Sequence, residues 1–129
     1  WTLEHVVPQS RIQSPAKKND LHNLAGLHTT INSSRGNKAF GHPKASSKIK
    51  DCRGCKISQS LFAPVVGKGE VARKCAYMFN SYGHYIDMPS VISQDTLLQW
   101  HEMFPPSDDE KRRNEFIYGV QGTYNMFVD

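Results

Sequence analysis

EHVVP (Glu4–Pro8) and HNLAGLHTTINSSRGN (His22–Asn37) are the two segments that decide the expected fold. The first predicts a β-strand that ends at Pro8, because apolar residues flank its polar pair and proline cannot donate to a strand ladder. In the second segment, Asn23–Leu27 predicts another short strand. The residue spacing over Thr29–Phe40 then predicts a helix that ends at the following glycine and proline. Together the two segments predict a short β-hairpin followed by a helix.

The remainder of the chain predicts three more helices. Residues 41–69 contain several glycines and prolines without periodicity and are expected to be irregular. Helices are expected over 70–83, 93–104 and 108–119, because apolar residues recur at helical spacing and Gly or Pro follows. The fold class is therefore α+β, and 129 residues suffice for one domain with one modest core. Aromatic residues at helical spacing are expected in that core: Trp100, Phe104, Phe116 and Tyr118.

Positive charge is concentrated in the first part of the chain. The net charge is +4, but residues 1–75 carry 13 Lys or Arg against 4 Asp or Glu, whereas residues 76–129 carry 3 against 8. A basic face for a polyanion would produce this asymmetry, and so would an unevenly charged solvated surface. No apolar run approaches the roughly 18–20 residues of a membrane span, so we expect a soluble domain. Nucleic acid is therefore an expected partner, and a membrane is not.

Glu4, His5 and Asn32 are of the residue types that phosphodiester hydrolysis requires. A neutral imidazole titrates near the operating pH and can remove a proton from an attacking water. Carboxylate and amide oxygens suit a hard cation such as Mg²⁺, which needs few protein ligands because it keeps several waters. One geometric condition applies. Neighbouring strand residues point to opposite faces, so Glu4 and His5 can share an ion only where the strand ends or bulges.

The order of these motifs resembles the endonuclease I family of the His-Me finger, or ββα-metal, nucleases. EHVVP is similar to the family's general-base motif, and DLHNL…NSSRGN, from Asp20 to Asn37, is similar to its D-x-H-N-L…N-x-x-R-S-N motif. Two further blocks, Gly67–Phe79 and Trp100–Asp129, are similar to the family's R-G-x-I-A-R helix and its Q-G-N-x-N-P-F-V-D ending. The resemblance thus covers nearly the whole chain. Arg73, in the first of these blocks, is expected to form a structural ion pair.

The resemblance implies a fold, an activity and residue roles. The fold is a single His-Me finger nuclease domain over residues 1–129, with a short β-hairpin and additional C-terminal helices. The activity is weakly sequence-specific hydrolysis of DNA, with RNA as the alternative, leaving 5′-phosphate ends. His5 would be the general base, and Glu4 and Asn32 would bind Mg²⁺ or another divalent cation. Three further residues would support the site or bind phosphate: Asn23, Arg35 and Asn37.

The three cysteines leave three interpretations open. Cys52, Cys55 and Cys75 could hold a structural zinc ion together with a histidine, for which His42 in the same segment is the first candidate. A disulfide with one free thiol is the second interpretation, and it suits a secreted enzyme. Three reduced thiols are the third.

Two classes of function follow from these observations. The first is the metal-dependent endonuclease, and the alternative is a non-catalytic, zinc-stapled DNA-binding module that retains the nuclease fold. The chain begins with Trp1 and shows no secretory signal, so it is either a complete domain or an excised part of a longer protein. Localisation therefore stays open, although members of the resembled family are often secreted or periplasmic. The oligomeric state stays open as well.

Overall fold

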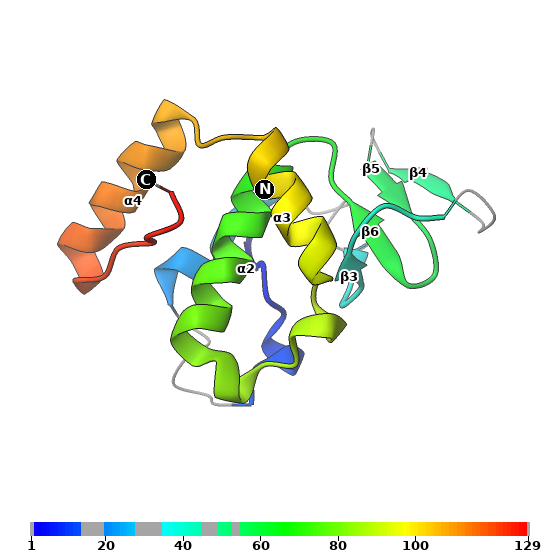
Figure 1. The fold of residues 1–129 in the computed structure, drawn as a ribbon, viewed down its shortest axis with the longest axis horizontal. Helices are drawn as coiled ribbons and strands as arrows, with labels where there is room; N and C mark the ends of the chain where they lie inside the picture. Colours follow the sequence, from blue (N-terminus) through cyan, green and yellow to red (C-terminus); the bar gives the residue numbers. More distant parts are fainter. Residues whose placement is uncertain (1, 14–19, 28–34, 45–48, 53–54, 129) are drawn as a thin grey trace.

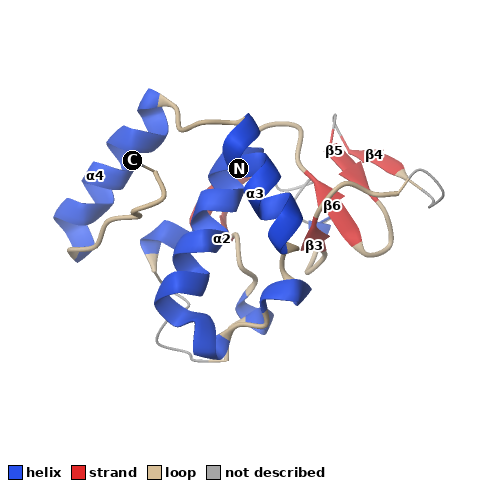
Figure 2. Cartoon of the chain, viewed as in Figure 1, coloured by secondary structure: helices blue, strands red, loops and turns tan. Residues whose placement is uncertain are grey.

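The computed structural model describes residues 2–13, 20–27, 35–44, 49–52 and 55–128 of the chain. These residues form two small β-sheets and three α-helices, which confirms the α+β class. Helix α2 (Lys68–Tyr82) lies in the middle of the molecule, with helix α4 (Asp108–Gln121) on one side and the larger sheet on the other (Figure 1). The same view coloured by secondary structure separates the helical part from this sheet (Figure 2).

A two-stranded antiparallel sheet carries the first predicted motif. Strand β1 (Thr2–His5) pairs with β2 (Leu24–Leu27), so that His5 lies opposite Leu24. β1 ends at His5 rather than at Pro8, and a short 3-10 turn follows. The hairpin therefore forms where the sequence predicts it, with a shorter first strand.

The helix predicted over Thr29–Phe40 ends earlier than expected. Residues 28–34 lie outside the described part of the chain, and Arg35 is the last helical residue of this segment. Gly36 follows with a φ of +55°, a left-handed conformation that glycine adopts without steric cost and that commonly ends helices. Strand β3 (Ala39–Phe40) comes soon after, so the prediction that the helix reaches Phe40 is wrong.

A four-stranded sheet occupies much of the segment that was expected to be irregular. Its strand order is β3–β6–β5–β4, with β4 at Lys50–Cys52, β5 at Cys55–Ile57 and β6 at Leu61–Ala63. β3 runs parallel to β6, whereas the other neighbouring pairs are antiparallel. The expectation of an irregular segment is therefore wrong. The sequence did not reveal these strands because strands of two or three residues are too short to show a detectable alternation.

Helix α2 forms the centre of the hydrophobic core. It contacts α3 (Gln94–Met103), and both sheets contribute residues to the same cluster. The hydrophobic residues without any exposed surface are Val7, Ala72, Cys75, Met78, Ile92 and Trp100. Among the described residues, no helix has the length and apolar character needed to cross a membrane.

Helix α4 begins as predicted but buries little apolar surface. The hydroxyl of Ser107 accepts a hydrogen bond from the backbone N–H of Glu110 at 3.1 Å, which caps the first turn. Asn114 and Ile117 are its buried residues. Of the aromatic residues predicted for the core, Trp100 is buried, but the other three are exposed: Phe104 at 42%, Phe116 at 70% and Tyr118 at 47%.

Candidate active site

A polar cavity of about 460 Å³ opens at the end of β1. Its wall comes from the last residues of β1, from the turn that follows, and from the segment where the helix before β3 ends. Four of the predicted site residues line it: Glu4, His5, Arg35 and Asn37. The fold therefore brings the two predicted motifs to one place.

The end of β1 meets the geometric condition on Glu4 and His5. Both side chains line the cavity although they are neighbours in the chain, because regular strand structure stops at His5. The Glu4 carboxylate makes no hydrogen bond or ion pair with the residues that the structure describes. The amide nitrogen of Gln9 lies 3.2 Å from Nε2 of His5. A carboxylate without a hydrogen bond to the described residues and an imidazole thus lie at one cavity.

Asn23 braces the chain just beyond His5. Its side-chain oxygen accepts a hydrogen bond from the Val7 N–H at 2.8 Å, and its amide nitrogen donates to the Val7 carbonyl at 3.0 Å. The Asn23 carbonyl also accepts from the Val6 N–H at 2.8 Å. Asn23 has no exposed surface, so these bonds are protected from competition by water. They hold the end of β1 beside β2 after the ladder itself has stopped.

Arg35 holds the same backbone from another direction. One terminal nitrogen donates to the His5 carbonyl at 3.1 Å, the other donates to the Val6 carbonyl at 2.7 Å, and the guanidinium lies 4.3 Å from the centroid of the Phe40 ring. Burial lowers the pKa of Arg35 to about 10, so the side chain stays charged at neutral pH. Arg35 therefore supports the backbone at His5 and uses two of its own N–H donors to do so.

Glu4 fits a divalent cation as an oxygen ligand. Asn32, the other predicted ligand, lies outside the described residues. Within the described ranges, no three histidine, cysteine or acidic side chains lie close enough together to hold a metal ion. A single accessible carboxylate suits Mg²⁺, which keeps most of its waters, better than zinc, which takes three or four nitrogen or sulfur ligands.

The predicted zinc ligands whose side chains the structure describes do not meet at one centre. Cys55 is disulfide-bonded, and Cys75 is a free thiol buried on α2, where burial raises its pKa to about 12. Nε2 of His42 accepts a hydrogen bond from the indole N–H of Trp100 at 3.2 Å. The side chain of Cys52 lies outside the description. This arrangement contradicts the zinc-ligand set and agrees with the alternative of a disulfide and one free thiol.

A buried acid that the sequence did not single out fastens the segment before β2. Asp20 accepts hydrogen bonds from the hydroxyls of Tyr77, at 2.8 Å, and Tyr82, and from the side-chain amide of Gln121 at 2.7 Å. Burial alone would raise the pKa of Asp20, but these bonds and one from the His22 backbone N–H lower it overall. Because this buried carboxylate accepts hydrogen bonds from four donors, it holds the segments that carry those donors firmly together.

The C-terminal part of the chain reaches the same segment. Nε2 of His22 donates to the Thr123 carbonyl at 2.8 Å, and Arg113 donates to the Leu24 carbonyl at 2.8 Å. Asn125 is buried and donates to the Arg73 carbonyl at 3.0 Å. The C-terminal part therefore holds both the hairpin and α2.

Sequence reasoning also missed two residues of the cavity wall. Gln9 and Ser10 line the cavity, although the sequence indicated only a polar loop there. The signal was present, because polar residues directly after a strand that carries candidate catalytic groups are close to those groups in space. Arg73, by contrast, behaves as predicted. Its guanidinium makes two hydrogen bonds, of 2.6 and 2.8 Å, to the Glu110 carboxylate, and Arg73 is buried.

A carboxylate and an imidazole at a polar cavity, carried by the basic part of the chain, are the groups that the sequence predicted for phosphodiester hydrolysis. Comparison with known proteins identifies the family. The model of the family described as Endonuclease I matches residues 1–129, and the chain therefore belongs to the endonuclease I family.

Several characterised relatives are similar over most of the chain. Extracellular ribonucleases of Bacillus amyloliquefaciens and Bacillus subtilis (strain 168) are each 30% identical over all of this chain, which covers 50% and 51% of their lengths. Endonuclease-1 of Buchnera aphidicola is 25% identical over 86% of this chain and 44% of its own length. The chain thus spans about half the length of the relatives it matches.

Proposed function

We propose that this chain is a metal-dependent endonuclease that hydrolyses phosphodiester bonds of DNA, and of RNA as the alternative substrate, with weak sequence specificity. The observation that carries the proposal is the meeting of Glu4 and His5 at one polar cavity whose wall includes Arg35 and Asn37. Membership of a nuclease family and the basic first part of the chain agree with it.

His5 acts as the general base. It removes a proton from a water molecule, the water oxygen attacks phosphorus, the bond to O3′ breaks, and the 3′ oxygen takes a proton from solvent. The products are a 5′-phosphate and a 3′-hydroxyl. The side-chain amide nitrogen of Gln9 lies 3.4 and 3.2 Å from the two ring nitrogens of His5, so Gln9 packs directly beside the imidazole. Arg35 and Asn23 hold the backbone that carries the imidazole.

Glu4 and Asn32 would hold the divalent cation, with Mg²⁺ as the first candidate. When bound, this cation supplies charge stabilisation for the phosphate oxygens and the leaving oxygen. Glu4 supports this part of the proposal because it lines the cavity and its carboxylate makes no hydrogen bond to a described residue. We further propose that the β1–β2 hairpin and the helix that ends at Arg35 form a His-Me finger core.

Plasmid nicking tests the proposal directly. We expect Mg²⁺-dependent nicking that EDTA abolishes, and His5→Ala should reduce turnover by roughly 10²–10⁴-fold. His84→Ala is the matched control, because His84 is exposed and lies on another element. Near-normal turnover in His5→Ala would remove His5 from the mechanism. DNA binding without any chelator-sensitive nicking would contradict the enzyme and favour a non-catalytic binding module.

The substrate and the product ends require separate assays. DNA and RNA of identical sequence should be compared, because two relatives are named ribonucleases and another is named an endonuclease. Cleaved ends should be ligated directly by a ligase that needs a 5′-phosphate. If they require prior treatment with a kinase, the proposed polarity is wrong. Binding should weaken steeply with salt, since phosphate contacts release counterions.

We propose that the protein acts outside the reducing cytosol. Cys55 is disulfide-bonded, and disulfides persist in oxidising compartments. The two Bacillus relatives carry the word extracellular in their names. Intact mass of protein from the culture medium should be lower by two hydrogens than that of the reduced protein. A native mass equal to the fully reduced mass would contradict the proposal.

A further inference from the structure

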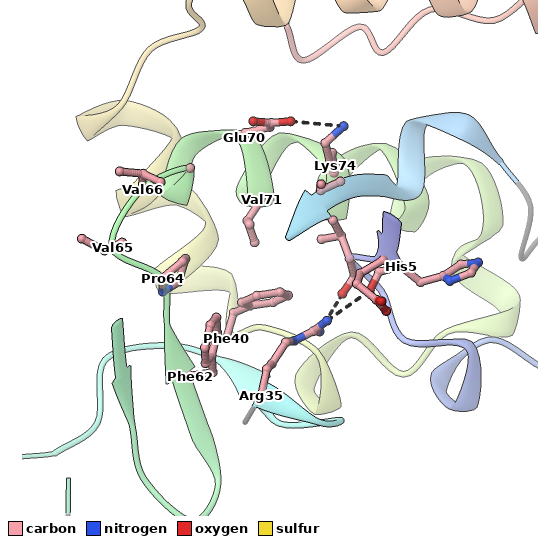
Figure 3. A pocket seen from close by; sticks show the side chains of 15 residues that line it. His5, Arg35, Phe40, Phe62, Pro64, Val65, Val66, Glu70, Val71 and Lys74 are labelled. Atoms are coloured by element: carbon pink, nitrogen blue, oxygen red, sulfur yellow. Dashed lines mark hydrogen bonds and ion pairs between the residues drawn. The ribbon is translucent and has the colours of Figure 1, made fainter. Parts of the chain in front are cut away.

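A second cavity, of about 300 Å³, adjoins the proposed active site. The two cavities share Glu4, His5 and Arg35 in their walls. The second cavity differs in character because its wall is largely apolar, with β2, β3, β6 and the start of α2 contributing (Figure 3). Its apolar lining is formed by Phe40, Phe62, Pro64, Val65, Val66 and Val71.

Packing does not explain this cavity. Phe40 and Phe62 are buried and form its floor, but Val65 and Val66 remain 51% and 78% exposed on the loop between β6 and α2. In Figure 3, Val71 projects from α2 toward the two phenylalanines across the open space. Proteins rarely keep such an apolar hollow beside a polar site unless something fills it.

The edge of the cavity that α2 forms carries one acidic and one basic side chain. Nζ of Lys74 lies 3.5 Å from the Glu70 carboxylate, and the Lys74 side chain is only 6% exposed. The two residues lie side by side at the edge of the cavity in Figure 3. A wall of apolar groups with a few convergent polar groups is typical of sites for small flat ligands.

We propose that this cavity binds the nucleobase next to the scissile phosphate. The inference rests on the proposed function, because the cavity shares Glu4 and His5 with the proposed catalytic site. A phosphate held at the polar cavity would place the adjoining nucleotide at this shared wall. The volume lies at the lower end of the roughly 300–1,000 Å³ typical of ligand sites and therefore suits one base.

This arrangement predicts a preference for unpaired strands. A base enters this cavity only after it leaves its stack, and unstacking costs less in a single strand than in a duplex. The apolar floor has no donors or acceptors with which to read the base edge. Besides the residues shared with the polar cavity, Glu70 and Lys74 at the rim are the groups able to distinguish one base edge from another.

An oligonucleotide with one abasic position tests the proposal. In the wild-type protein with Mg²⁺, we expect cleavage at the step beside the abasic position to fall roughly 5- to 150-fold below cleavage of the same step with its base. Equal cleavage of the two steps would overturn the base site and leave the nuclease proposal intact. Absence of cleavage in every oligonucleotide would instead contradict the nuclease proposal.

Filling the cavity supplies an independent test. Val71→Phe and Val66→Trp should lower cleavage of the ordinary step to the level of the abasic step and leave the abasic step unchanged. Val66 is an exposed loop residue, so Val66→Trp probes the cavity even if Val71→Phe disturbs packing. Leu98→Trp, at an exposed position of α3, is the matched control. Equal loss at both steps in a folded Val66→Trp variant would contradict the base site.

Discussion

Replacing Asn23 by alanine will test whether polar bracing holds the proposed catalytic segment in place. Asn23 is fully buried, and its side chain satisfies both the N–H and the carbonyl of Val7 at 2.8 and 3.0 Å. Alanine leaves both groups without their partner in the interior. Val7, two residues beyond His5, then loses its side-chain connection to the turn that precedes β2, and only the backbone bond from Val6 to the carbonyl of residue 23 remains.

The expected cost follows from these two bonds. A buried backbone group without a partner costs roughly 1–3 kcal/mol, so two such groups should cost roughly 2–6 kcal/mol. Because a domain of this size is stable by only about 5–15 kcal/mol, Asn23→Ala should lower the urea midpoint markedly. A water molecule that enters the vacated space would move the result toward the lower end of the range.

Urea denaturation followed by circular dichroism measures this cost, and plasmid nicking at low temperature measures the effect on catalysis. Asn80→Ala is the matched control, because Asn80 is exposed on α2 and its replacement should change stability by no more than about 0.5 kcal/mol. A stability change in Asn23→Ala as small as that of Asn80→Ala would refute the bracing role. Unchanged nicking by folded Asn23→Ala would show that His5 is positioned by other contacts.

Three further predictions concern groups outside the cavity. Burial lowers the pKa of His22. Burial alone would raise the pKa of Asp20, but its hydrogen bonds lower this pKa overall. Protonation of either residue therefore destabilises the fold. The urea midpoint should therefore fall as the pH drops below about 6.5 and again below about 3.8, and His22→Gln should flatten the first decline. Glu110→Gln should lower the free energy of unfolding by about 3–5 kcal/mol, because it leaves the buried Arg73 without its anion. Replacing both partners by well-packed apolar residues should restore much of this lost stability. Cys75 should resist alkylation in the native protein and react only after unfolding, since burial raises its pKa to about 12; rapid native labelling would contradict this.

The elements that the sequence predicted are those with local signals. The Ser93 hydroxyl caps α3 through the N–H of Thr96 at 3.2 Å, and Ser107 caps α4 in the same way. Such capping contacts span three residues, so they can be read from a short window. The hairpin was also predictable, because its turn-rich flanks and the order of its motifs lie within the first part of the chain.

The features that the sequence did not predict depend on distant pairing. Strands β4, β5 and β6 contain three residues each. Hydrogen bonds to neighbouring strands define them, and their sequences show no alternation of apolar and polar residues long enough to detect. Phe116 shows why helical spacing alone was misleading. It was expected in the core, yet α4 buries Ile117 and Asn114, three positions apart on one face, while Phe116 stays exposed on another. Polar contacts to the tail, which no window reveals, decide which face of α4 turns inward.

The candidate site itself depends on contacts between remote segments. A hairpin of two four-residue strands is at best marginally stable alone, so the cavity at its end requires outside support. Arg35 supplies that support from the helix end, and Arg113 supplies it from α4 through the Leu24 carbonyl. Asp20 joins the segment before β2 to α2, through Tyr77, and to the end of α4, through Gln121. The two motifs therefore identify the chemical groups, whereas the position of these groups depends on polar residues up to a hundred positions away.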